Sequence, residues 1–195
     1  MIISKEEAKM NLRENTLRLL EVVKEKAVLH GDFTLTSGLK SSYYFDLRLA
    51  TLDPEGAYLV GKLIFELVSG KVDAIGGLTL GANPIVTAVA FASFLEGKPI
   101  PAFIVRTETK ERGTQKRIEG HLTKGGKVAI VDDVATTGGS LFKAIEAVET
   151  EGCQVVKVIA ILDRHQGGSD ELRKRGYDFI AILSADASGE ISINS

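Results

Sequence analysis

Two adjacent carboxylates, Asp132 and Asp133, follow an apolar run at 128–131 and precede a turn rich in threonine, glycine and serine. Gly138 and Gly139 allow the backbone to approach a ligand closely, so that successive N–H groups, the nearby hydroxyl groups and a helix N-terminus can bind the oxygens of a phosphate monoester. The carboxylates can accept hydrogen bonds from the vicinal hydroxyl groups of a ribose, or order a hydrated divalent cation. The stretch therefore predicts a phosphate-binding turn beside an acidic pair.

An ordinary strand–turn–helix junction is the alternative interpretation of this stretch, because Asp, Thr and Gly commonly form turns and helix N-caps. It leaves the two adjacent acids unexplained, since their mutual repulsion costs free energy. Other phosphate-binding patterns fit worse: the chain has no G-x-x-x-x-G-K-[ST], and no G-x-G-x-x-G follows a first strand. A receiver domain carries its acidic pair at the first strand, whereas more than half of this chain precedes Asp132.

The elements that must position this site alternate between apolar strands and helices. Strands are predicted at 74–75, 102–105, 128–131, 155–162 and 179–183, and helices at 54–70, 84–94, 139–149 and 171–175. Continuously apolar strands separated by helices predict an α/β fold with a central parallel sheet flanked by helices on both faces. Ligands of such sheets bind beyond the carboxyl ends of the strands, where the acidic pair would lie.

A small N-terminal hood is expected to cover that edge of the sheet. Ser4 and Glu7 form a possible capping box, which opens a helix with an apolar stripe as far as Ala27. The segments 33–36 and 43–47 then indicate a small antiparallel hairpin. The polar segment 106–120 is predicted to be a loop.

Composition and charge narrow the class of protein. The 195 residues carry a formal net charge of −2, which argues against a dedicated nucleic-acid-binding domain. The longest apolar stretch has about half of the ~20 residues that a bilayer requires, so no membrane span is expected. With no visible secretory signal and a single cysteine, Cys153, the sequence predicts a cytoplasmic protein without an internal disulfide.

The acidic pair and its turn resemble the motif of type I phosphoribosyltransferases that binds 5-phosphoribosyl 1-diphosphate (PRPP). Three more stretches are similar to orotate phosphoribosyltransferases: the hood at 33–46, the loop at 106–120, and Leu162-Asp163-Arg164 with the glycines that follow. The four motifs occur in the family's order and span most of 33–168. The resemblance implies one phosphoribosyltransferase domain over 1–195, with about 1–48 contributing the helix and hood hairpin.

The resemblance also implies a reaction: PRPP and orotate give orotidine 5′-monophosphate and diphosphate in de novo pyrimidine biosynthesis, with Mg²⁺ held mainly by PRPP and water. It implies a homodimer with shared active sites and no nucleic-acid or membrane partner. The catalytic residues it implies are Lys110, Asp132 and Asp133, with the two aspartates on the ribose hydroxyl groups. The substrate-binding residues it implies are Arg106, Lys110 and Arg112 for the diphosphate; Gly81 in the diphosphate loop; Val134, Ala135, Thr136, Thr137, Gly138, Gly139 and Ser140 for the 5′-phosphate; and Arg164, Thr136, Tyr44 and Phe45 around orotate.

The chain departs from the family's pattern at several positions. Many members have lysine where Thr36 and Thr107 stand, and histidine where Arg112 stands, and some place an aromatic-lysine pair at Leu80-Gly81. Three expected cations are therefore absent, and Lys40 is a candidate to replace one of them.

The residues alone leave two alternative functions open. A purine phosphoribosyltransferase shares the PRPP motif, but an arginine at the base site suits an acidic substrate better. A regulator that senses PRPP without catalysis would need a basic surface or an added nucleic-acid-binding domain, which the net charge disfavours.

Overall fold

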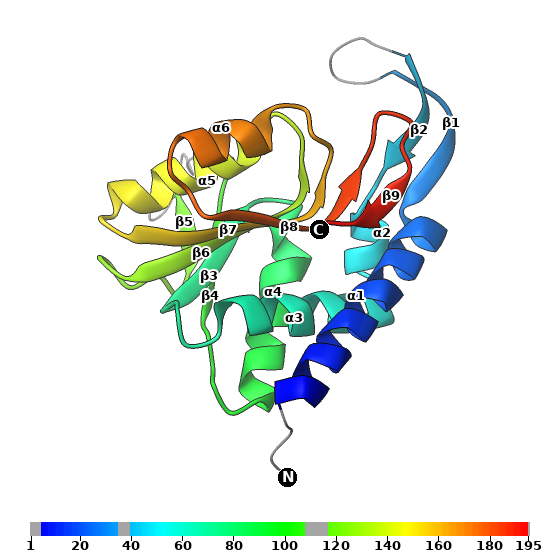
Figure 1. Cartoon of the computed structure of the whole chain (residues 1–195). Coiled ribbons are helices and arrows are strands. Elements are labelled where there is room, and N and C mark those ends of the chain that lie inside the picture. The colour runs from blue at the N-terminus through cyan, green and yellow to red at the C-terminus, as the bar shows by residue number, and fades with distance from the viewer. Residues whose placement is uncertain (1–4, 35–39, 108–116, 195) are drawn as a thin grey trace.

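The structure, a computed structural model, describes residues 5–34, 40–107 and 117–194. In this part of the chain, strands form a sheet in the order β5-β4-β3-β6-β7-β8-β9 (Figure 1). The strands are β3 (Ala74–Leu78), β4 (Ala102–Val105), β5 (Ile118–Gly120), β6 (Lys127–Ala135), β7 (Gln154–Asp163), β8 (Phe179–Ala185) and β9 (Ile191–Ile193). The five central strands run parallel, and the two edge strands pair antiparallel with their neighbours.

Helices cover both faces of the sheet, as the alternation along the sequence predicts. α3 (Pro54–Val68) and α4 (Ala82–Leu95) lie on one face, and α5 (Gly139–Thr150) and α6 (Gly168–Lys174) on the other (Figure 1). Successive side chains of β6 alternate between the two layers. Ala129 and Val131 pack with α3 and α4, while Val128 and Ile130 pack with α5. This two-sided burial is why the central strands are apolar throughout.

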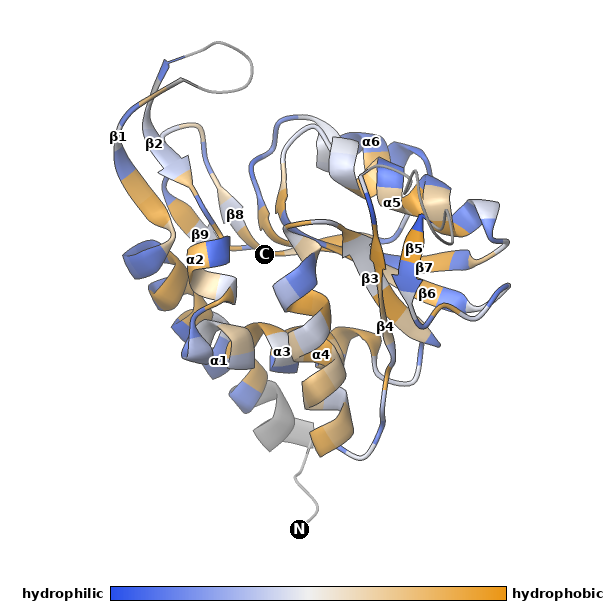
Figure 2. Ribbon diagram, turned by 180° about the vertical axis from the view of Figure 1, so that it is seen from behind, coloured by the Kyte–Doolittle hydropathy of each residue, from blue (hydrophilic) through white to orange (hydrophobic). Residues whose placement is uncertain are grey.

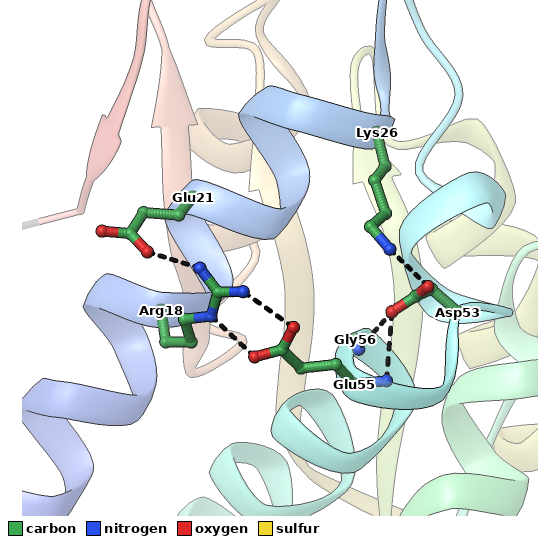
Figure 3. A network of polar contacts seen from close by, with 6 residues as sticks. All are labelled: Arg18, Glu21, Lys26, Asp53, Glu55 and Gly56. Carbon is green, nitrogen blue, oxygen red and sulfur yellow. Dashed lines mark hydrogen bonds and ion pairs between the residues drawn. The ribbon is translucent and has the colours of Figure 1, made fainter.

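The N-terminal part comprises α1 (Lys5–Lys26), the hairpin of β1 (Val28–Thr34) and β2 (Lys40–Phe45), and the short helix α2 (Arg48–Thr51). Figure 3 shows how α1 is tied to the start of α3. Arg18 Nε lies 2.6 Å from Glu55 Oε1, and Lys26 Nζ lies 2.5 Å from Asp53 Oδ2. The other oxygen of Asp53 caps α3 by accepting hydrogen bonds from the N–H groups of Glu55 and Gly56.

Several boundaries differ from the sequence-based predictions. The strand predicted at 128–131 continues to Ala135, because its backbone still pairs with β7 beyond the acidic pair, up to Ala135 opposite Asp163. Asp132 and Asp133 therefore lie within the strand and not after it. The predicted loop at 106–120 ends in β5, and β9 and α2 were not predicted. Each of these elements has only three or four residues, too few for a detectable period.

The hood hairpin is confirmed as antiparallel, but β1 begins at Val28, earlier than predicted. Its second strand ends at Phe45, because Asp46 and the residues after it form a turn leading into α2. Ser4, one half of the proposed capping box, lies outside the described residues, as does Thr36. None of the helices in the described part of the chain is long and apolar enough to cross a membrane.

Candidate active site

A cavity of about 950 Å³ opens at the carboxyl ends of β3, β6 and β7, beneath the hood. This is the edge at which ligands of such sheets bind. Its lining residues are Tyr44, Phe45, Asp46 and Arg48 from the hood and α2; Leu78, Thr79, Leu80 and Gly81 at the end of β3; Asp132, Asp133, Val134, Thr136, Thr137 and Ser140 from β6 and its turn; and Arg164 and Gln166 after β7.

The acidic pair is part of this lining. Asp132 is only 5% exposed; its Oδ2 accepts a hydrogen bond from the Ser140 hydroxyl and its Oδ1 accepts one from the N–H of Asp133 at 3.0 Å. Burial, and then the charge of Asp133, raise the pKa of Asp132 from 3.8 to about 7. A second carboxylate is thus kept beside a buried one at an electrostatic cost, which suits a ligand that supplies hydroxyl donors or positive charge.

The loop after β3 lies directly against the acidic pair. A Cβ at Gly81 would come within 2.5 Å of Asp133 Oδ1 and 2.8 Å of Asp132 Oδ1. No side chain fits there unless the carboxylates move, which gives a physical reason for glycine at this position of the chain.

The turn after β6 has the geometry of an anion-binding site. Gly138 has φ +81° and precedes α5, and no side chain caps the first N–H groups of that helix. Thr136, Thr137 and Ser140 line the cavity, whereas Gly138 and Gly139 do not, and Ala135, which ends β6, does not line it either. The structure thus places hydroxyl donors and a helix N-terminus on the same side of the cavity.

An arginine and an aromatic wall form another part of the lining, where β7 ends. The guanidinium carbon of Arg164 lies 5.2 Å from the ring centroid of Phe45 and 5.8 Å from that of Tyr43. The N–H of Arg164 donates to the Ala135 carbonyl oxygen at 3.0 Å, which joins this segment to the turn after β6. With Tyr44 also in the lining, this side suits a flat group that bears a carboxylate.

Not every residue assigned from the sequence reaches the cavity. Arg106 does not line it; its Nη1 lies 3.1 Å from Glu119 Oε1, at the base of the loop. Lys110 and Arg112 lie outside the described residues.

Two charged lining residues, Asp46 and Arg48, were given no role by the sequence. They form a two-bond ion pair, with Nε to Oδ1 at 2.8 Å and Nη2 to Oδ2 at 3.0 Å. The signal that could have revealed them is a pair of opposite charges two residues apart, directly after the aromatic end of β2.

Comparisons with known proteins agree with this geometry. Residues 52–183 match the model of the phosphoribosyl transferase domain. The orotate phosphoribosyltransferase of Aquifex aeolicus is 46% identical over 172 residues, which are 88% of this chain and 94% of the relative.

Solved structures give the same result. An orotate phosphoribosyltransferase of Mycobacterium tuberculosis, in complex with Fe(III) dicitrate, is similar with a TM-score of 0.79 at 39% identity, covering 87% of this chain and 96% of that one. The M. tuberculosis enzyme in complex with PRPP is similar with a TM-score of 0.75 at 37% identity, with the same coverage.

Proposed function

Because this chain belongs to the orotate phosphoribosyltransferase family, we propose that the cavity under the hood is its active site. The chain is a pentosyltransferase that converts orotate and PRPP into orotidine 5′-monophosphate and diphosphate, a step of pyrimidine biosynthesis. The observation that supports this site best is the convergence of the acidic pair, the anion-binding turn and Arg164 on a single cavity. The relatives do not favour the two alternatives, a purine phosphoribosyltransferase and a non-catalytic regulator.

The residues around the cavity divide the two substrates between them. Asp132 and Asp133 accept hydrogen bonds from the ribose hydroxyl groups of PRPP, and the segment 134–140, from the end of β6 to the start of α5, binds the 5′-phosphate. Arg164 binds the carboxylate of orotate through charge-assisted hydrogen bonds, with Thr136 beside it. Tyr44 and Phe45 cover the flat ring.

The reaction itself is a substitution at the anomeric carbon through an oxocarbenium-like state. Negative charge builds up on the departing diphosphate, so the main tasks of the protein are electrostatic stabilisation and exclusion of water. Lys110, with Arg106 and Arg112, supplies the positive charge from the loop that follows β4. In the described structure Arg106 is paired with Glu119, so binding the diphosphate requires Arg106 to exchange that partner.

The residues present fit Mg²⁺ that arrives with PRPP. The acidic pair offers two adjacent carboxylates, and the described residues include no group of three or more His, Cys, Asp or Glu side chains that could hold a metal ion by themselves. Oxygen ligands from PRPP and water would complete the coordination, as Mg²⁺ prefers. When bound, the ion neutralises part of the diphosphate charge.

A homodimer is supported by the outward side of α4. Phe91, Phe94 and Leu95, named here the α4 face, are 65%, 71% and 66% exposed, while Val86 and Val89 on the other side of the helix are buried in the core. Figure 2 shows apolar colouring over the C-terminal end of α4. A helix that is apolar on all sides is normally covered on all sides, so we assign the α4 face to contact with a second copy of the chain.

A substrate panel tests the proposed function. The purified chain is incubated with PRPP and Mg²⁺ and either orotate, adenine, hypoxanthine or uracil. Orotate should be consumed, with release of diphosphate, and the other three bases should not. Preferred consumption of a purine would contradict the assignment of Arg164 to an acidic base, and binding of PRPP without any turnover would support the regulator.

A further inference from the structure

The charges around the cavity are unequal before the substrates bind. The described lining contains three carboxylates, Asp46, Asp132 and Asp133, and two guanidinium groups, Arg48 and Arg164. Both substrates are anions, and PRPP carries the greater charge. This chain has Thr36 where many family members have lysine, and Gly81 where some of them have lysine.

Arg48 is oriented so that it can accept another anion. Its bonds to Asp46 use Nε and Nη2, which leaves the Nη1 hydrogens without an acceptor among the residues that the structure describes. Asp46 Oδ1 also accepts a hydrogen bond from the backbone N–H of Arg48 at 3.2 Å, so Asp46 bonds both the backbone and the guanidinium group of this residue. The arginine side chain is 40% exposed to solvent, and the residue lines the cavity.

The position of α2 relates Arg48 to the acidic pair and to the loop after β3. α2 packs against α3 and α4, and α4 begins directly after Gly81. Arg48 and Asp133 line the same cavity, and the Asp46 carboxylate, by hydrogen bonding, and more weakly the Asp133 charge raise the pKa of Arg48. Arg164 follows β7, which is separated from β3 by β6. Arg48 and Arg164 therefore approach the acidic pair from different elements.

We propose that Arg48 binds the diphosphate group of PRPP, and the diphosphate as it leaves, while Asp46 acts as the positioning residue that orients the guanidinium. This inference rests on the proposed function. Arg48 would replace, from the hood side, a cation that other members of the family carry on the loop after β3 or in the hood.

The test compares Arg48→Gln with Arg18→Gln. Arg18 is the matched control, because it forms the same kind of two-bond pair with Glu55 (Nε–Oε1 2.6 Å, Nη2–Oε2 2.8 Å) and does not line the cavity (Figure 3). KM values for PRPP and for orotate are measured, and binding of inorganic diphosphate with Mg²⁺ is measured by calorimetry. Arg48→Gln should weaken binding of PRPP and of diphosphate by about tenfold to a hundredfold, the effect of losing a charged hydrogen-bonding partner. Its KM for orotate should stay within about twofold, and Arg18→Gln should match the parental protein in all three values.

Two more variants keep the test decisive if Arg48→Gln folds poorly. Arg48→Lys should restore part of the diphosphate affinity, and Asp46→Asn, which keeps the size of the side chain, should weaken diphosphate binding less than Arg48→Gln. A loss confined to orotate, or unchanged diphosphate binding in all three variants, would overturn the inference. If the parental chain bound diphosphate but did not consume orotate, the proposed function would fail, and the calorimetry would still decide the role of Arg48.

Discussion

The ionisation of Asp132 makes the stability of the unliganded protein depend on pH. The carboxyl group is 5% exposed and adjoins Asp133, and its pKa is raised from 3.8 to about 7. Between these two values the folded protein binds more protons than the unfolded chain, so this group lowers the free energy of unfolding as the pH rises through that interval. Above pH 7 the cost of the buried charge is fully present.

Asp132→Asn should therefore stabilise the unliganded protein at pH 8 while it impairs turnover. An amide keeps an acceptor for the N–H of Asp133 and carries no charge, so we expect a gain of at least about 1.4 kcal/mol, the equivalent of one pKa unit. Urea unfolding at pH 5 and pH 8 measures it, and the difference between variant and parent should grow with pH. A difference between variant and parent that is constant over this pH range would contradict a raised pKa for Asp132. The double variant with Asp133→Asn should lose far more turnover than stability, since the ribose site loses both negative charges and the stronger hydrogen bonds that carboxylates accept.

Arg164 should act on one substrate only. Its guanidinium group sits against Phe45 on the side of the cavity assigned to orotate. Each charge-assisted bond to the orotate carboxylate contributes about 1.5–3 kcal/mol, so Arg164→Ala should weaken orotate binding tenfold or more and change PRPP affinity little. KM values for the two substrates measure this, with Arg173→Ala, outside the cavity lining, as the control. Equal losses for both substrates would contradict the division of the cavity between them.

At the scale of the elements, two segments that follow different strands are packed together to build the phosphate turn. The N–H of Gly168 at the start of α6 donates to the Thr136 carbonyl oxygen at 2.9 Å. A Cβ at Gly168 would lie 2.5 Å from Gly138 N and 2.6 Å from Thr136 O, both backbone atoms that cannot turn aside. The shape of the anion-binding turn therefore depends on α6 as well as on α5.

Gly168→Ala should test this dependence. The added methyl group must push the two segments apart, which should lower the free energy of unfolding by about 1–3 kcal/mol and weaken PRPP binding. Gly139→Ala is the control for stability, because Gly139 is likewise the first residue of its helix and a Cβ there meets only Thr137 Oγ1 at 4.0 Å. Its stability should change by no more than about 0.5 kcal/mol. Equal destabilisation in both variants would show that the packing of α6 on the turn is not what matters.

The length and burial of each strand explain which parts of the fold could be predicted from the sequence. β6 and β7 are long and apolar because both of their faces are buried, so their residues alone reveal them. β5 and β9 have three residues each and form where a neighbouring strand offers a free edge, which local residue patterns do not encode. The acidic pair and its turn are contiguous, so the site around β6 was predictable. Arg48 enters the cavity only through the packing of α2, which depends on residues distant in the sequence.

For the whole molecule, the α4 face should decide the oligomeric state. Phe91→Glu combined with Phe94→Glu places two charges on this apolar surface and should turn a dimer into a monomer in analytical ultracentrifugation. Leu17→Glu is the control, because Leu17 is an exposed apolar residue on α1, at 45% exposure. A dimer that survives the double substitution would place the interface elsewhere.

Sharing of active sites between the two subunits of a dimer can be tested by mixing two inactive variants. If the loop of one subunit closes over the cavity of the other, each active site combines one chain's acidic pair with its partner's Lys110. Lys110→Ala should be nearly inactive because the leaving diphosphate loses a cation, and Asp133→Asn should be impaired at the ribose. When the two variants are unfolded and refolded together in equal amounts, about half of the dimers should be mixed, and each mixed dimer should contain one site with both defects and one with neither. Roughly a quarter of the parental activity should then return. If each loop served its own subunit, every site would keep one defect, and mixed dimers confirmed by mass spectrometry would regain no activity.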